Sequence, residues 1–316
     1  MQQYALKRVL LAGVVLMLVS LVTFSLIRLL PGDVILQMLQ EHRPLSSDEV
    51  ERLRKELGLD RPFVTQYAAW VSQLMRGDLG KSLFTGEPVR DMMMRRLPFT
   101  LQVAVMAVLM ALVIAIPVGV YSAVHQETVG DHGGRILAVL GLSLPDFWTA
   151  TMVVTFGAIW LHWNPPLETV YIWVDPVKNL EKFLVPAAIL QFRLSAVAIR
   201  MTRSGMLEVL RQDYIRTARA KGLRQRAVVF RHALKNAFIP VITILGQQFG
   251  VLLGGTVIVE TVFALPGLGR LTLDAVVQRD YTTIQGTVMF FAAVVVLMNL
   301  VVDLTYAWFD PRIRYR

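Results

Sequence analysis

The chain alternates between long apolar stretches and shorter polar segments along its whole length. A helix needs about 20 mostly apolar residues to cross the hydrocarbon core of a bilayer. Six stretches reach that length, at about Val9 to Leu30, Leu97 to Val124, Leu137 to Trp163, Phe183 to Met201, Ala237 to Phe263 and Ile284 to Phe309. Pro145 is expected to mark either a kink in the third stretch or its true start. The pattern predicts an all-α integral membrane protein with six transmembrane helices.

The first apolar stretch, within residues 1–30, has features of a secretory signal, since Lys7 and Arg8 precede it. Its apolar run is longer than a typical signal core, however. Pro31-Gly32-Asp33 follows it in place of a cleavage site with small residues. We therefore interpret this stretch as a retained first transmembrane helix.

Residues 31–96, between the first two spans, are of mixed polarity and are predicted to form a helical loop. Ser46 and Glu49 have the spacing of a capping box, and apolar positions at helical intervals follow before Gly58. Pro62 can start a second helix. The apolar stripe of that helix consists of Phe63, Tyr67, Trp70, Val71 and Leu74. We expect a small helical cap on the membrane domain, and leave open whether it contacts a substrate.

The composition supports a membrane protein, with 55% hydrophobic residues and a mean hydropathy of +0.53. No cysteine is present, which excludes disulfides and thiolate metal sites. The net charge of +9 raises the question of nucleic-acid binding. Between Arg193 and Lys235, however, eleven Lys and Arg residues face two acidic ones, an excess equal to that of the whole chain. Such clustering favours the positive-inside pattern of membrane proteins over nucleic acid as a partner.

The charges of the loops predict the topology. Lys7 and Arg8 place the N-terminus inside, and the acidic loop from Leu161 to Lys182 suits the outside. The basic loop 204–236 and the tail with Arg312, Arg314 and Arg316 then fall inside. The prediction is therefore N-in and C-in, with the cap after the first helix outside and residues 97–316 forming the membrane core with its inner loop.

The basic loop contains a pattern of two helices broken by a glycine. Arg211 to Ala220 can form a helix with Leu210, Tyr214 and Ala218 on one side. Gly222 can end it in a left-handed conformation, after which Arg224 to Lys235 resumes as a second helix. Such an elbow suits docking into a groove of a soluble partner. The alternative is a solvated basic loop without a partner.

The fifth span carries a stripe of small residues at Gly246, Gly250 and Gly254. In a membrane such a stripe lets another helix backbone approach closely. It serves either packing within this chain or a seam between two subunits. Gln247, Gln248 and Glu260 on or near the same span are costly in lipid and should face protein or water. They are candidates for lining a polar route, with a structural role as the alternative.

Several catalytic and binding motifs are absent. Gly80-Lys81-Ser82 resembles the end of a phosphate-binding loop, but the glycine required five residues earlier is Met75. The five histidines show no paired ligand spacing, and neither GxSxG nor HExxH occurs. We expect a chain that is not an enzyme and has no catalytic residue, metal site or cofactor of its own.

The chain resembles the membrane-spanning permease subunits of ATP-binding-cassette importers, in the peptide/nickel branch. DYIRTARAKGL at 213–223 and RHALKNAFIPVIT at 231–243 are similar to that branch. The general signature of the family is Glu-Ala-Ala followed four positions later by Gly, and here Arg216-Thr217-Ala218 and Gly222 stand there. Further similar segments are LGLDRPFVTQY at 57–67, RGDLGKS at 76–82, FALPGLGRL at 263–271, RDYTTIQG at 279–286 and DPRIR at 310–314.

The resemblance implies a subunit in the inner membrane of a bacterium that pairs with a second, homologous permease. Two cytoplasmic ATP-binding subunits and an extracytoplasmic solute-binding protein would complete the importer. The residues that would couple to the ATPase are Asp213, Tyr214, Arg216, Thr217, Ala218, Lys221, Gly222 and Leu223. Peptides, nickel chelates, glutathione and oligosaccharides are all open as cargo. A secondary transporter and a membrane receptor or scaffold are the alternative functions.

Overall fold

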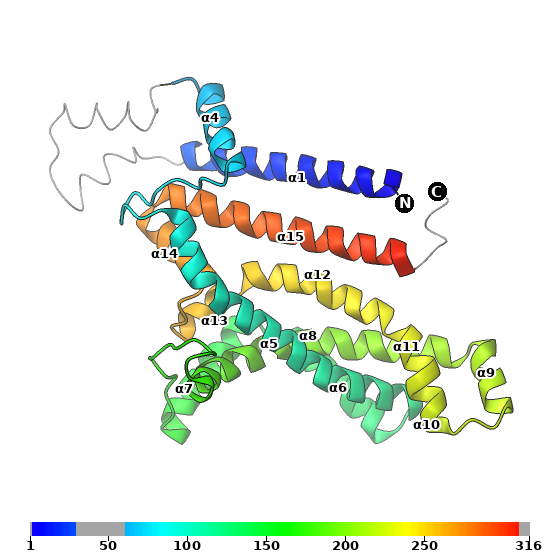
Figure 1. Ribbon diagram of the computed structural model, residues 1–316. Helices are drawn as coiled ribbons and strands as arrows, with labels where there is room; N and C mark the ends of the chain where they lie inside the picture. The colour runs from blue at the N-terminus through cyan, green and yellow to red at the C-terminus, as the bar shows by residue number, and fades with distance from the viewer. Residues whose placement is uncertain (1, 30–60, 310–316) are drawn as a thin grey trace. The chain divides into compact units, whose positions relative to one another are not determined.

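The computed structural model describes residues 2–29 and 61–309. Within these ranges the secondary structure is helical, apart from an isolated antiparallel bridge between Lys81 and Pro88. The elements are, in chain order (Figure 1), α1 (Gln2–Leu29), α4 (Phe63–Met75), α5 (Val89–Val124), α6 (Val129–Ser143), α7 (Asp146–Leu161), α8 (Pro176–Leu210), α9 (Asp213–Ala220), α10 (Gln225–Ala227), the π-helix η1 (Val228–Ala233), α11 (Leu234–Ala237), α12 (Ile239–Gly255), α13 (Val257–Val262), α14 (Leu268–Gln278) and α15 (Tyr281–Phe309).

The described residues divide into two compact units. Unit 1 comprises residues 2–29, 61–95 and 271–300, and unit 2 comprises residues 96–270 and 301–309. Helices α5, α14 and α15 each contribute to both units, because the boundaries fall within them.

Four single helices are long and apolar enough to cross a membrane, and they contain the segments Leu6–Ser25, Val89–Val124, Pro176–Leu210 and Tyr281–Asp303. Two further candidates are bent pairs of helices, α6 with α7 and Gln225–Ala237 with Ile239–Gly254. The described part of the chain therefore has between four and six candidate spans. This agrees with an integral membrane protein built from helices.

The third apolar stretch differs from the single span of Leu137 to Trp163 that its composition predicts. The chain forms two helices, α6 and α7, whose axes meet at 97°. Pro145 explains the break, since the residue before a proline is biased away from the helical region. Leu144 accordingly has an extended backbone with φ −89° and ψ 120°, and α7 begins directly after Pro145.

The fifth apolar stretch, expected from Ala237 to Phe263, is also divided. Helix α12 ends at Gly255 and α13 follows from Val257. On its N-terminal side, the axis bends by 46° between Ala237 and Ile239. Pro240 lies in the first turn of α12, where its missing N–H is tolerated.

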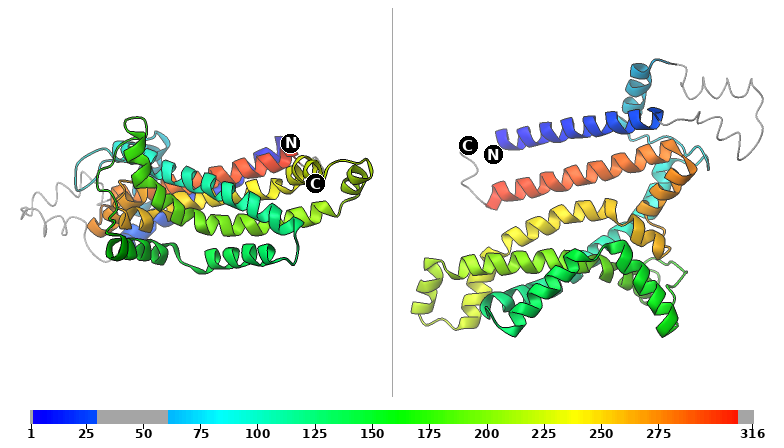
Figure 2. Two further views of the ribbon diagram at one scale, coloured as in Figure 1. Left: turned by 90° about the horizontal axis from the view of Figure 1, so that it is seen from below. Right: turned by 180° about the vertical axis from the view of Figure 1, so that it is seen from behind.

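In unit 1, the helix that the sequence predicts to start at Pro62 is present. Helix α4 begins after Pro62 and lies across the end of α1 (Figure 2). Phe24 of α1 packs against Phe63, Tyr67 and Trp70 of α4, with ring centroids 5.3 to 5.4 Å apart. The capping box predicted at Ser46 and Glu49 lies outside the described residues.

The Gly80-Lys81-Ser82 segment of unit 1 is a structural turn. The buried carboxylate of Asp280, just before α15, accepts hydrogen bonds from the Ser82 hydroxyl, from the Leu83 N–H at 3.2 Å and from the Thr283 hydroxyl at 2.8 Å. A Cβ on Gly80 would lie 2.7 Å from Thr282. Two segments that are distant in sequence, RGDLGKS at 76–82 and RDYTTIQG at 279–286, therefore contact each other.

In unit 2, the polar loop between α7 and α8 is fastened to α8. Buried Lys182 donates a hydrogen bond from Nζ to the carbonyl of Leu167 at 2.7 Å. Asn179 donates to the carbonyl of Val170, also at 2.7 Å. Phe99 of α5 stacks on Tyr171 of the loop, with ring centroids 4.8 Å apart.

Candidate functional site

The predicted elbow is present in unit 2 and follows directly on the long helix α8. Arg211 closes α8, because its N–H bonds to the carbonyl of Glu208 and the N–H of Gln212 bonds to that of Val209. The next helix therefore begins at Asp213 and not at Arg211 as the pattern predicts. After α9 the chain reverses at Gly222, whose φ is +74°, and this confirms the predicted left-handed glycine. Figure 2 shows α9 beyond the end of α8, and the chain returning through α10 towards α12.

The buried face of α9 is formed by Ile215 and Ala218. Ile215 is fully buried and Ala218 nearly so, whereas Tyr214 is 42% exposed. The Tyr214 hydroxyl accepts a hydrogen bond from Nδ2 of Asn236 at 2.8 Å. Of Leu210, Tyr214 and Ala218, which the sequence places on one side of a helix, Ala218 is buried, Leu210 is half-buried and Tyr214 is exposed. The adjacent aliphatic Ile215 takes the core position, since its side chain has no polar atom to satisfy.

Ile215 and Ala218 anchor α9 in a hydrophobic cluster that joins several elements of unit 2. Its other members are Val120 and Ala123 from α5, Met206 from α8, Val228, Val229 and Ala233 from η1, and Ala237 from α11. Because apolar contacts of this kind act between all the elements they join, α9 is held to the ends of α5 and α8 rather than hanging as a free loop.

The outer face of the elbow carries almost all the residues expected to couple. Those that are exposed are Asp213, Tyr214, Arg216, Thr217, Lys221, Gly222 and Leu223, while Ala218 faces the cluster. Asp213 and Arg216 form an ion pair at 3.4 Å. The face thus combines cations with an exposed aromatic ring and an exposed leucine, a mixed surface suited to a protein groove.

The second limb of the elbow is irregular, where the sequence predicts one helix from Arg224 to Lys235. It consists of α10, the π-helix η1 and α11. A π-helix is rare and occurs mostly as short segments at functional sites. Val228, Val229 and Ala233 of η1 lie in the cluster described above, so the wider turn places apolar side chains against α9.

The predicted glycine stripe of α12 is covered to different degrees within this chain. A Cβ on Gly246 would lie 3.1 Å from Val302, Gly250 is buried, and Gly254 is exposed with nothing within 4 Å of an added Cβ. Gln247 is exposed and Gln248 is half-buried. Close packing within the chain therefore accounts for Gly246 but leaves the Gly254 end of the stripe open.

Glu260, the third candidate for a polar route, lies in the interior of unit 2. Its carboxylate accepts hydrogen bonds from the hydroxyls of Thr100 at 2.7 Å and Thr256 at 2.9 Å, and from the N–H of Arg270 at 2.9 Å. Gly267 and Gly269 approach it so closely that a Cβ on either would collide with the carboxylate. In this structure Glu260 organises the FALPGLGRL turn, the structural role that was the alternative.

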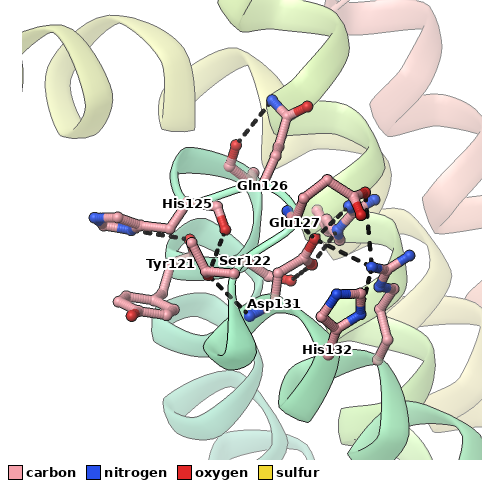
Figure 3. Close-up of polar contacts among 11 residues, drawn as sticks. Tyr121, Ser122, His125, Gln126, Glu127, Asp131 and His132 are labelled. Atoms are coloured by element: carbon pink, nitrogen blue, oxygen red, sulfur yellow. Dashed lines mark hydrogen bonds and ion pairs between the residues drawn. The ribbon is translucent and has the colours of Figure 1, made fainter.

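A buried ion pair next to the elbow was not anticipated from the sequence. Asp131 near the start of α6 is fully buried and accepts two hydrogen bonds from Arg203 of α8, from Nε at 2.8 Å and from a terminal nitrogen at 2.9 Å. It also accepts hydrogen bonds from the Ser122 hydroxyl of α5 and from the N–H of Glu127 at 3.1 Å (Figure 3).

Within residues 2–29 and 61–309, no group of three or more His, Asp or Glu side chains is placed to hold a metal ion.

One signal for this ion pair was available in the sequence. Thr128 and Asp131 have the spacing of a helix N-cap and its third residue, and the Thr128 hydroxyl does accept a hydrogen bond from the Asp131 N–H at 3.4 Å. Arg203 entered the sequence argument only as one of the clustered basic residues. Its partner lies 72 positions away, a distance that no local pattern bridges.

Comparison with known proteins shows the class of this chain. Residues 115–315 match the family described as "Binding-protein-dependent transport system inner membrane component", and residues 1–104 match the N-terminal domain of the same systems. The chain therefore belongs to the permeases of binding-protein-dependent ATP-binding-cassette importers, in the peptide family.

Its curated relatives are named as peptide permeases. A putative peptide transport system permease protein of Brucella abortus (strain 2308) is 41% identical over 310 residues, covering 98% of both chains. The dipeptide transport system permease protein DppB of Escherichia coli (strain K12) is 38% identical over 341 residues, covering all of both. A crystal structure of an amino acid ABC transporter with histidines aligns with a TM-score of 0.49 and 18% identity, covering 71% of this chain and 94% of the other.

Proposed function

We propose that this chain forms half of the translocation pathway of a peptide importer and that its elbow couples the pathway to an ATPase. The observation that carries the proposal is the construction of α9, a short helix fixed from below by Ile215 and Ala218 with its outer face exposed. Family membership over residues 115–315 supports it, since the elbow lies within that range.

The proposed topology has six spans, with both termini and the elbow on the cytoplasmic side of a bacterial inner membrane. The two bent pairs would each count as one span. The excess of Lys and Arg in and around the elbow supports this orientation. Such an arrangement leaves the fastened loop between α7 and α8 outside, facing the solute-binding protein.

The proposed assembly contains a second homologous permease, two cytoplasmic ATP-binding subunits and an extracytoplasmic solute-binding protein. ATP would be hydrolysed on the partner chains, with no cofactor and no catalytic residue in this one. The exposed end of the glycine stripe at Gly254 is available for the second permease. Gln247 and Gln248 remain the candidates for lining the route.

The mechanism follows from the anchoring of α9. A soluble ATPase that closes on nucleotide would grip the exposed face of the elbow and displace it. Because α9 shares one apolar cluster with α5, α8 and η1, the displacement would be passed to the spans as a rigid-body movement. Each nucleotide state must then bind one conformation of the permease better than the other.

A peptide is the proposed cargo class, on the printed names of the relatives. A nickel chelate is the alternative within the same branch. The test is reconstitution of the whole importer in vesicles, with a labelled dipeptide added on the extracytoplasmic side of the membrane. ATP-dependent accumulation supports the proposal. Accumulation without ATP or without the ATP-binding subunits would indicate a secondary transporter, and association without accumulation of dipeptide or nickel chelate would indicate a scaffold.

A further inference from the structure

The ion pair of Asp131 and Arg203 joins three helices at one point. Asp131 belongs to α6, Ser122 to α5 and Arg203 to α8, and all three side chains meet within unit 2. Arg203 contacts the carboxylate with two nitrogens at 2.8 and 2.9 Å, the forked geometry that fixes orientation as well as distance. The pair therefore fixes the start of α6 against α8.

The carboxylate also holds the short connection between α5 and α6. It accepts a hydrogen bond from the N–H of Glu127, whose φ is +60°, a left-handed conformation that few residues other than glycine adopt. Arg135 adds a second cation, 3.6 Å from Asp131 and 3.7 Å from Glu127. Figure 3 shows Asp131 at the centre of these contacts.

The same helices carry the elbow. Met206, one turn beyond Arg203 on α8, lies in the apolar cluster beneath α9. On α5, Val120 and Ala123 on either side of Ser122 belong to that cluster too. The polar contacts of Asp131 and the apolar anchor of α9 are therefore built on the same stretches of α5 and α8.

A second contact fixes the far end of α6 to α8. A Cβ on Gly141 would lie 2.8 Å from both the Phe192 carbonyl and the Ala196 side chain. Beyond it, α6 ends and the chain bends by 97° into α7. Helix α6 is thus held at both ends along α8, by an ion pair near the elbow and by close packing near the bend.

From this geometry we propose that Asp131 and Arg203 are a positioning pair that makes α5, α6 and α8 move as one body with the elbow. The inference rests on the proposed function. Its content is that α6 keeps one orientation on α8 only while the pair is intact, because the close packing at Gly141 alone would leave α6 free to pivot about that point. Neither residue touches cargo or nucleotide in this account, since both act through the helices that they join.

The test measures the α6–α8 distance in the assembled importer. This chain has no cysteine, so within it nitroxide labels attach only at Val129→Cys, at the start of α6 near the pair, and at Arg200→Cys on α8, both exposed positions. Double electron–electron resonance spectroscopy then gives the distribution of distances between the two labels, first without nucleotide and then after trapping with ATP and vanadate. We expect one narrow distribution, unchanged between the two states.

The variant of choice is Asp131→Asn combined with Arg203→Met. Removing one partner alone leaves a buried charge without compensation and risks unfolding, whereas removing both charges avoids this. We expect the double variant to retain binding of the ATP-binding subunits and to lose the single narrow distance, with distributions that differ between the two states. The single variant Arg203→Lys keeps the positive charge but not the two-pronged guanidinium contact. Its distance distribution should lie between those of the parent chain and the double variant.

A matched control is Glu168→Gln, which removes an exposed ion pair with Lys178 in the same unit. It should leave the distribution as in the parent chain. A double variant that keeps one narrow distance in both states overturns the proposal, as does a parent chain whose α6–α8 distance changes on trapping. A parent chain that fails to bind the ATP-binding subunits contradicts the proposed function instead, and the distributions of the isolated parent and double variant then decide whether the pair fixes α6 to α8.

Discussion

At the scale of single residues, backbone conformation explains the glycine at the elbow. Gly222 has φ +74° and open space around an added Cβ. The left-handed backbone conformation, and not crowding by neighbouring atoms, therefore requires glycine at position 222. Gly86 in unit 1 has φ +72° and equally open space, so it provides a position with the same strain outside the elbow.

Gly222→Val should therefore destabilise the chain by about 1–3 kcal/mol and also abolish binding of the ATP-binding subunits, because the reversal after α9 is distorted. Gly86→Val should cost a similar amount and leave that binding intact. Thermal unfolding and co-purification of each variant provide the comparison. Normal binding and uptake with Gly222→Val would count against the elbow as the docking surface.

The buried ion pair gives a second prediction at this scale. Asp131→Asn should lower the free energy of unfolding by about 1–3 kcal/mol, because partly exposed Arg203 loses its charge-assisted hydrogen bonds to a buried carboxylate. Glu168→Gln should lower it by less than about 1 kcal/mol, because the Glu168–Lys178 pair is exposed and screened by solvent. Unfolding in mixed micelles measures both. Equal effects would mean that Asp131 is not held as the structure describes.

At the scale of elements, the apolar lengths in the sequence predict where candidate spans lie, but not how they bend. The 97° angle after α6 depends on how Leu144 and Pro145 pack, and composition alone predicts only that a proline disturbs a helix. The reversal at Gly222 was predictable because left-handed backbone strongly favours glycine. The buried face of α9 was not, because Tyr214 and Ile215 are adjacent and both have large apolar surfaces.

Helix α9 gives an element-scale prediction that separates its anchor from its surface. Ile215→Ala removes a fully buried side chain from the cluster and should weaken the anchoring of α9 by about 2–5 kcal/mol. Tyr214→Phe removes one exposed hydrogen bond and should change it by about 0.5–1.5 kcal/mol. Amide hydrogen exchange across residues 213–221 measures the opening of this helix. Equal exchange in the two variants would contradict the assignment of the buried face.

Helix α12 gives a prediction about association. Gly254 is exposed at the open end of the stripe, with nothing within 4 Å of an added Cβ, so Gly254→Leu should prevent close approach of the second permease and reduce recovery of the assembled importer. Gly13→Leu is a control in α1, where nothing lies within 4 Å of an added Cβ. Recovery of the complex by affinity purification is the measurement. Full recovery and full transport with Gly254→Leu would exclude the stripe as a seam between subunits.

At the scale of the whole molecule, local patterns identify the class of protein better than they identify its working parts. Apolar length and charge asymmetry lead to a multi-pass membrane protein, and the family match agrees. The contacts that hold the parts together join residues far apart in sequence, as with Ser82 and Asp280 or Asp131 and Arg203. These pairs depend on the folded arrangement of helices, which is why no spacing rule reveals them.

The central claim is that the outer face of the elbow lies in the cytoplasm and is covered by an ATP-binding subunit. The most direct measurement uses Leu223→Cys, an exposed position in a chain without other cysteines, and a membrane-impermeant thiol reagent. The account predicts no labelling in intact cells, labelling in inside-out vesicles stripped of the ATP-binding subunits, and protection when these are added back. Labelling of Leu223→Cys from outside intact cells would contradict it.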